Sequence, residues 1–174
     1  LDFFEGKLGN FEARVFRISF SGELSFEIAV PSKDGIAFWM RCLELGRDLD
    51  LTPYGTEALH IMRAEKGFIM IGDETDGTVI PQDLNLEWAI SKKKRDFIGK
   101  RAHERIFMQD INRKTLVGLS LQNSTKKIPA GAYALKSGGK GAKDVLGHIT
   151  SSYFSPTLDK PIAMALLKNG KALK

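Results

Sequence analysis

The chain has 174 residues, of which 43% are hydrophobic and 27% charged, and its formal net charge is +5. This length allows one large or two small domains with a sizeable core, and the composition is that of an ordinary soluble globular protein. A lone cysteine excludes an internal disulfide framework, and no apolar run reaches the roughly 20 residues that span a bilayer, so we expect a cytoplasmic protein without a membrane segment or signal peptide.

The first part of the chain predicts a β-hairpin followed by a helix. Residues 13–20 and 24–30 mostly alternate apolar with polar side chains, and Ser21-Gly22-Glu23 forms the short connection that an antiparallel hairpin needs. Apolar residues at helical spacing then predict an amphipathic helix over residues 33–49.

A second, more apolar helix is expected next. Thr52 suits its cap, Pro53 its first position and Gly67 its end. Its apolar side is broad enough to require packing on most sides. A hairpin and helices in this order indicate an α+β fold.

The middle of the chain is harder to interpret. Residues 87–90 are typical of a short buried strand, and residues 99–108 predict a helix with Ala102, Ile106 and Phe107 facing inward. A domain boundary is expected near Asn112, dividing the chain into residues 1–111 and 112–174.

Four strand-like runs follow the boundary, at residues 115–121, 131–135, 145–153 and 162–167. Loops rich in glycine, serine, lysine and proline separate them, with Ser137-Gly138-Gly139 as the clearest turn. These runs predict a small antiparallel β module of the barrel type.

Most chemical motifs are weak. His60, His103 and His148 lack the spacing of metal ligands, and Cys42 on the apolar side of a helix is expected to be a buried small hydrophobe. The glycine-rich stretch 138–141 lacks the ending of a phosphate-binding loop.

The cationic run at residues 92–95, with Lys100 and Arg101, fits a solvated face, an attraction for small anions or a nucleic-acid site. No aromatic residues interleave with it as stacking platforms, so we expect no nucleic-acid partner.

Glu27 lies in the second predicted strand, where its face depends on the register. Leu24, Phe26, Ile28 and Val30 share one face, and if that face forms the core, Glu27 lies on the other. There its carboxylate is either plain surface or the polar group of a ligand pocket, and the residue pattern leaves both open.

A resemblance to a known family adds to this interpretation. F-S-G-E-L-S-F-E-I at residues 20–28 resembles the folate-binding hairpin of the glycine-cleavage T-protein family, written Y-T-G-E-x-G-F-E-I. Other family motifs follow in order over nearly the whole chain: R-A-E-K-G, G-x-E-T-D, T-V-I-P, L-N-L-E-W-A-I, D-F-I-G-K-R, L-V-G-L and G-H-I-T-S-S-Y-F-S-P-T-L. The resemblance implies a partial folate-binding domain over residues 1–111 and a β-barrel domain over residues 112–174.

Within the family, residues 18–27 and 52–68 are similar to the α subunits of heterotetrameric sarcosine oxidases. This similarity implies that sarcosine is oxidised at a flavin elsewhere in the complex and that the one-carbon unit passes to tetrahydrofolate, giving 5,10-methylenetetrahydrofolate. FAD, FMN and NAD are then expected outside this chain. The implied partners are the preceding part of the same subunit, the other subunits and a small-molecule folate.

Three residues carry the implied folate site. Glu27 matches the glutamate that hydrogen-bonds the pterin ring, and Phe20 occupies the position of a tyrosine that lines the pocket. Arg63 matches the second arginine of A-R-D-x-x-R-L-E, where a ligand contact and a structural role both stay open. The folate-contacting first arginine of that motif is replaced by Leu59.

No catalytic residue is expected in this chain, because the aspartate that assists transfer in the family precedes Leu1. Since Leu1 is not methionine, we interpret the chain as a piece of a longer protein that is inactive alone. The alternatives are a glycine-cleavage-type aminomethyltransferase, a dimethylglycine-oxidising enzyme, or a folate-binding module without chemistry of its own.

Overall fold

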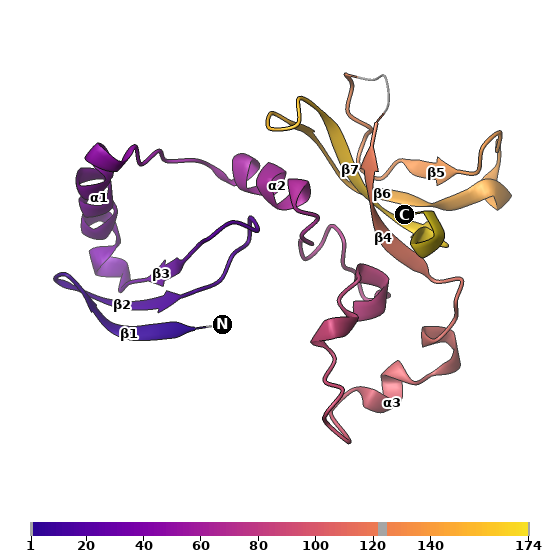
Figure 1. The fold of residues 1–174 in the computed structure, drawn as a ribbon, viewed down its shortest axis with the longest axis horizontal. Helices are drawn as coiled ribbons and strands as arrows, with labels where there is room; N and C mark the ends of the chain where they lie inside the picture. Colours follow the sequence, from indigo (N-terminus) through magenta and orange to yellow (C-terminus); the bar gives the residue numbers. More distant parts are fainter. Residues whose placement is uncertain (1, 122–124, 174) are drawn as a thin grey trace. The chain divides into compact units, whose positions relative to one another are not determined.

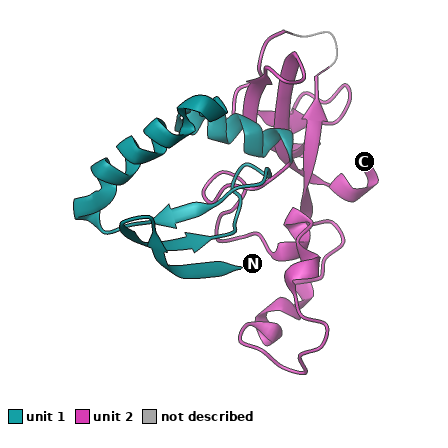
Figure 2. Ribbon diagram, turned by 60° about the vertical axis from the view of Figure 1, so that its left-hand side comes forward, with its two compact units in different colours: residues 1–66 teal, residues 67–174 magenta. Residues whose placement is uncertain are grey.

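The structure is a computed structural model that describes residues 2–121 and 125–173. Its chain divides into two compact units, Leu1–Lys66 and Gly67–Lys174 (Figure 2). The expected boundary near Asn112 lies inside the second unit and stays a prediction about the family's domains. Among the described residues, no helix is long and apolar enough to cross a membrane.

The first unit contains a three-stranded antiparallel sheet in the order β1-β2-β3 (Figure 1). The strands are β1 at Phe3–Leu8, β2 at Phe11–Phe16 and β3 at Glu27–Ala29. The predicted hairpin is confirmed as β2 and β3, although only three residue pairs form. Residues 17–20 and 24–26 of the predicted strands lie in the connection between β2 and β3. Strand β1 was not predicted, and it pairs with β2 along its whole length.

A helix packs on one face of this sheet. α1 spans Gly35–Gly46, between 3-10 turns at Ser32–Asp34 and Arg47–Leu49, so the helix predicted over residues 33–49 is confirmed. Phe11 of β2 meets Phe38 of α1 edge to face, with ring centroids 5.4 Å apart.

The second helix of this unit, α2, spans Thr56–Glu65. The predicted stop is confirmed, because Gly67 takes the left-handed conformation at φ +72°. The predicted start is wrong: Gly55 rather than Thr52 precedes the first turn. The expected packing on most sides is not observed, since the apolar residues of α2 are only half-buried.

The second unit contains a four-stranded antiparallel sheet in the order β4-β7-β6-β5 (Figure 1). All four predicted strands are confirmed: β4 at Lys114–Ser120, β5 at Tyr133–Leu135, β6 at Val145–Ser155 and β7 at Lys160–Lys168. One side of the sheet buries a continuous apolar cluster, made of Val117, Ile149, Ala163, Ala165 and Leu167.

Strand β6 carries an irregularity next to β7. The pairing shifts by one residue between Ile149 and Ser151, which makes Thr150 the extra residue of a β-bulge. Nearby, a Cβ atom at Gly147 would lie 1.8 Å from the carbonyl oxygen of Leu166, so these two backbones approach more closely than a side chain permits.

Two predictions for the middle of the chain are wrong. The expected strand at residues 87–90 is a 3-10 turn, Glu87–Ala89, with Trp88 77% exposed. The expected helix at residues 99–108 is a short helix, α3 at Lys100–His103, followed by a 3-10 turn at Ile106–Met108. Ala102, Ile106 and Phe107 are exposed rather than inward.

The long irregular segment before β4 is held by buried carboxylates. Asp83 lies in the 3-10 turn Pro81–Leu84 and accepts hydrogen bonds from Arg113 Nε at 3.0 and 3.1 Å, from Arg113 Nη2, and from the Ile80 N–H at 3.0 Å. Glu74 accepts hydrogen bonds from Ser151 of β6 and from the Met70 N–H. Further 3-10 turns lie at Ala142–Asp144 and Gly170–Leu173.

Candidate functional site

The register of the first sheet settles which face Glu27 occupies. Glu27 is the cross-strand partner of Phe16, and Ile28 is the partner of Val15. Opposite residues of antiparallel strands share a face. Ile28 and Phe11 line the groove between the sheet and α1, which has a volume of about 1080 Å³. Glu27 therefore lies on the face away from α1, and its side chain is exposed.

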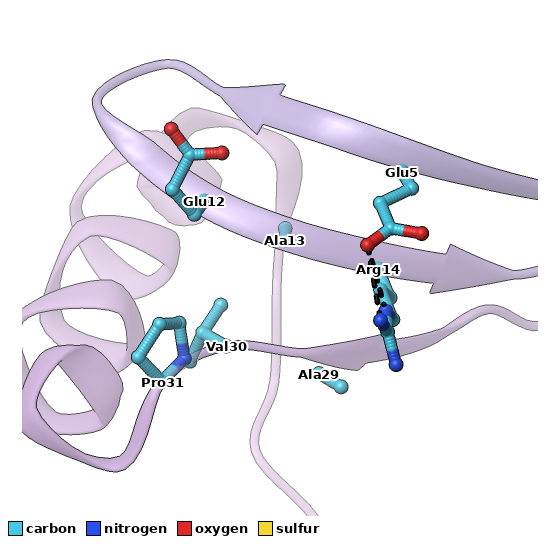
Figure 3. Close-up of a pocket in the computed structure, with 7 residues that line it drawn as sticks. All are labelled: Glu5, Glu12, Ala13, Arg14, Ala29, Val30 and Pro31. Atoms are coloured by element: carbon cyan, nitrogen blue, oxygen red, sulfur yellow. Dashed lines mark hydrogen bonds and ion pairs between the residues drawn. The ribbon is translucent and has the colours of Figure 1, made fainter.

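That second face is charged. Its members are Phe3, Glu5 and Lys7 of β1, Glu12, Arg14 and Phe16 of β2, and Glu27 and Ala29 of β3. Arg14 pairs with Glu5 at 3.0 Å, beside a shallow hollow of about 260 Å³ (Figure 3). Because Glu5 already engages the guanidinium, this hollow offers little to an anionic ligand.

The connection between β2 and β3 is closed by its own hydrogen bonds. Ser19 Oγ accepts a hydrogen bond from the Gly22 N–H at 2.9 Å, and Ser21 Oγ accepts one from the Glu23 N–H at 3.3 Å. Arg17 donates to the Ser25 carbonyl at 3.2 Å. These contacts fix the conformation of the loop that leads to Glu27.

The tip of this loop packs on the end of α2. Gly22 has φ +86°, and a Cβ atom there would lie 2.7 Å from Lys66 Cγ, so the position requires glycine for two reasons. Lys66 forms an ion pair with Glu23 at 2.8 Å. The hydrogen bond to Glu23 raises the pKa of Lys66 above its ordinary value.

Phe20 contacts the same helix. Its ring lies 6.2 Å from the ring of His60, with the planes tilted by 40°, and 38% of the residue stays exposed. An aromatic ring half covered by its own fold keeps a surface on which a planar ligand can stack. The loop and the first residue of β3 therefore present one ring and one carboxylate, Phe20 and Glu27, within one stretch of eight residues.

Arg63 differs from the other two expected site residues. It lies three positions after His60 on α2 and is fully buried, at 0% exposure. Full burial of a guanidinium requires partners inside the protein. The full burial of Arg63 is consistent with a structural role, and that role stays a prediction.

Other candidate motifs of the sequence show no built site. No group of three or more metal-binding side chains gathers within residues 2–121 and 125–173. In the glycine-rich turn, the N–H groups of Lys140 and Gly141 donate to the Asp144 carboxylate at 3.1 and 3.3 Å, so the turn already holds an anionic group of its own. The cations at residues 92–95 are all exposed. Cys42, expected to be buried, is only half-buried and lines the groove beside α1.

The sequence did not reveal two residues beside Glu27. Phe16 and Phe3 reach the charged face through the pairing of β2 with β1, and β1 was not predicted. The only signal for β1 is the stretch F-F-E-G-K-L before the first predicted strand.

Comparison with known proteins finds two family models. The model described as the GCVT N-terminal domain matches residues 1–94, and that of the glycine cleavage T-protein C-terminal barrel domain matches residues 114–174. The stretch between the two matches contains the expected boundary near Asn112, within two residues of the second match.

Similar curated proteins fall into two groups. A sarcosine oxidase subunit alpha of Corynebacterium sp. (strain P-1) is 45% identical over 92% of this chain, and one of Rhizobium meliloti is 38% identical over 90%. An aminomethyltransferase of Halothermothrix orenii is 33% identical over 98%. The chain spans only 17%, 16% and 46% of the lengths of these three proteins.

A solved structure has the same fold. The glycine cleavage system aminomethyltransferase T from Bartonella henselae superimposes with a TM-score of 0.77 at 28% sequence identity. The superposition covers 90% of this chain and 42% of that one.

Proposed function

This chain belongs to the glycine-cleavage T-protein family, and from that membership we propose that it forms part of a tetrahydrofolate-binding domain in a sarcosine oxidase α subunit. The observation that carries the proposal is the position of Glu27. An exposed carboxylate follows a loop that is closed by its own hydrogen bonds, on the sheet face that α1 does not cover.

Glu27 suits the recognition of a pterin on chemical grounds. An ionised carboxylate accepts two parallel hydrogen bonds, and the pterin edge offers two adjacent N–H donors. Phe20 of the same loop adds a partly exposed ring that can stack on the planar ligand. Tetrahydrofolate, when bound, supplies the amine nitrogens that accept the one-carbon unit.

The role assigned to this chain is binding and orientation. Glu27 and Phe20 hold the ligand, while Lys66 and Glu23 fix the loop on α2. The oxidation of sarcosine, with FAD, FMN and NAD, is proposed for other parts of the complex, as is the acid or base that assists transfer. The 174 residues alone are accordingly expected to catalyse nothing.

A second candidate has support from the comparisons. The 33% identity with aminomethyltransferases and the TM-score of 0.77 also fit a glycine-cleavage-type or dimethylglycine-linked transferase. Both candidates use the same folate site and differ in the amine donor. Assays of the natural polypeptide with sarcosine, dimethylglycine and the aminomethyl-loaded carrier protein of glycine cleavage separate them, and sarcosine is the expected substrate.

The test of the folate site is Glu27→Gln in the natural polypeptide that carries this chain. Loss of the charged partner of a hydrogen bond costs about 1.5–3 kcal/mol, so affinity for 5-formyltetrahydrofolate, measured by calorimetry, should fall about tenfold to a hundredfold. Sarcosine-dependent reduction of the flavin should not change.

The matched control is Glu12→Gln. Glu12 is an exposed carboxylate on the same sheet face, and its ion pair with Lys7 is a surface contact at 3.7 Å. This variant should bind the folate normally. Equal affinities for the Glu27→Gln variant and the unmodified protein would remove Glu27 from the site.

A further inference from the structure

The charged face of the first sheet carries two aromatic rings in line with Glu27. Glu27 of β3 is opposite Phe16 of β2, and Phe16 is opposite Phe3 of β1. Directly opposite residues have Cβ atoms about 4.5–5.5 Å apart on one face. Phe3, Phe16 and Glu27 therefore form a row that crosses all three strands, called here the aromatic row.

The two rings of the aromatic row are stacked on each other, Phe16 being half-buried and Phe3 largely exposed. Their centroids lie 6.3 Å apart with 23° between the planes, and Phe3 is 70% exposed. On the opposite face of β2, by contrast, Phe11 is packed edge-on against Phe38 of α1. The charged face thus holds a largely exposed ring, Phe3, stacked on a half-buried ring, Phe16, among side chains that form surface ion pairs.

We propose that the aromatic row is the stacking surface for a folate whose pterin is held by Glu27, an inference that rests on the proposed function. Tetrahydrofolate contains two planar systems in sequence, the pterin and the aminobenzoyl ring. Phe16, adjacent to the carboxylate, stacks on the pterin. Phe3, one strand farther away, contacts the aminobenzoyl ring.

The geometry makes the row a specificity device. The carboxylate at one end of the row fixes the hydrogen-bonding edge of the ligand. The two rings in line increase the affinity for a ligand that has a second ring beyond its pterin. Stacking depends on a π face and little on hydrogen bonds, so it adds affinity for the ring system as a whole. Phe3 therefore discriminates folates from pterins that lack the aminobenzoyl group.

The test uses Phe16→Leu and Phe3→Leu in the natural polypeptide, titrated with 5-formyltetrahydrofolate and with a reduced pterin lacking the aminobenzoyl group. Phe16→Leu should weaken both ligands about fivefold to thirtyfold, because leucine keeps apolar volume but has no π face. Phe3→Leu should weaken only the folate. Phe16→Tyr, which keeps the ring, should stay within about twofold of the unmodified protein.

Phe11→Leu is the matched control for stability. It lies on the same strand but faces α1, so it should lower the melting temperature and leave folate affinity unchanged. If Phe16→Leu lowers the melting temperature and leaves folate affinity unchanged, Phe16 is a packing residue and the aromatic row is overturned while the Glu27 site stands. If the unmodified protein fails to bind the folate, the row and the proposed function are both overturned.

Discussion

The two sheets of this protein differ in how they use their faces. The four-stranded sheet of the second unit buries a continuous cluster around Val117 and Ala165. The three-stranded sheet of the first unit buries hardly any apolar side chain, Ala13 being the exception among its described residues, and exposes Phe3, Phe4 and Ile28. The first sheet carries the candidate site and the second carries its own core. A recognition surface needs side chains that the fold leaves uncovered, whereas a stable sheet needs them covered.

The largest expected effect on stability concerns the buried ion pair between Arg113 and Asp83 in the second unit. Arg113→Met leaves Asp83 buried without its guanidinium partner, and breaking such a pair costs about 3–5 kcal/mol of unfolding free energy. Arg14→Met removes the exposed pair with Glu5 in the first unit and should cost no more than about 1 kcal/mol. Urea denaturation followed by circular dichroism measures the loss of unfolding free energy in each variant. Similar losses in the two variants would contradict the expected difference between the units.

A second prediction compares apolar residues of the two sheets. Leu167→Ala in β7 removes a side chain that is 5% exposed and should cost about 2–5 kcal/mol. Ile28→Ala in β3 removes one that is 41% exposed and should cost about 1 kcal/mol. Hydrogen–deuterium exchange resolves the two sheets, with β7 amides expected to be protected longer than β3 amides. Greater protection of β3 would contradict the comparison.

The smallest effect concerns pH. Thr78 donates to the Asp76 carboxylate through its hydroxyl at 2.6 Å and its N–H at 2.7 Å, and these bonds lower the pKa of Asp76. A lowered pKa stabilises the fold above the ordinary value of about 3.9, and this stabilisation is lost as the pH falls through the folded-state pKa.

The variant Thr78→Val tests this pH dependence. It should lower the melting temperature slightly at pH 7, and the difference from the unmodified protein should shrink below about pH 4. A difference that persists unchanged at pH 2.5 would assign the effect of Thr78 to packing. In the first unit the sign is opposite. The raised pKa of Lys66 means that its ion pair stabilises the fold at neutral pH, and this stabilisation is lost at strongly alkaline pH.

Local patterns predicted the regular elements well. Alternation identified β2 and β3, and helical spacing identified α1. The four strands of the second sheet were recognised as strand-like runs separated by turn residues, and β7 is buried on both faces. The failures have physical causes. Arg105 adopts an extended conformation, φ −64° and ψ 143°, which interrupts the helix expected at residues 99–108. In β1 the adjacent Phe3 and Phe4 break the alternation that would have marked it as a strand.

The candidate site was predictable only in part. The resemblance to the family supplied Glu27, Phe20 and Arg63, but the face of Glu27 depends on a register that no single strand determines. The contact of Phe20 with His60 and the alignment of Phe16 with Glu27 join segments separated in the sequence. Such neighbours become visible only when strands and helix are assembled.

The bulge at Thr150 affects the curvature of β6 independently of its residue pairing with β7. Ile149 and Ser151 face consecutive residues of β7, Ala165 and Met164, so removal of Thr150 would keep every one of these partners. What the extra residue changes is the bend and twist of the strand. A one-residue deletion at position 150 should therefore act as a change of curvature at constant pairing.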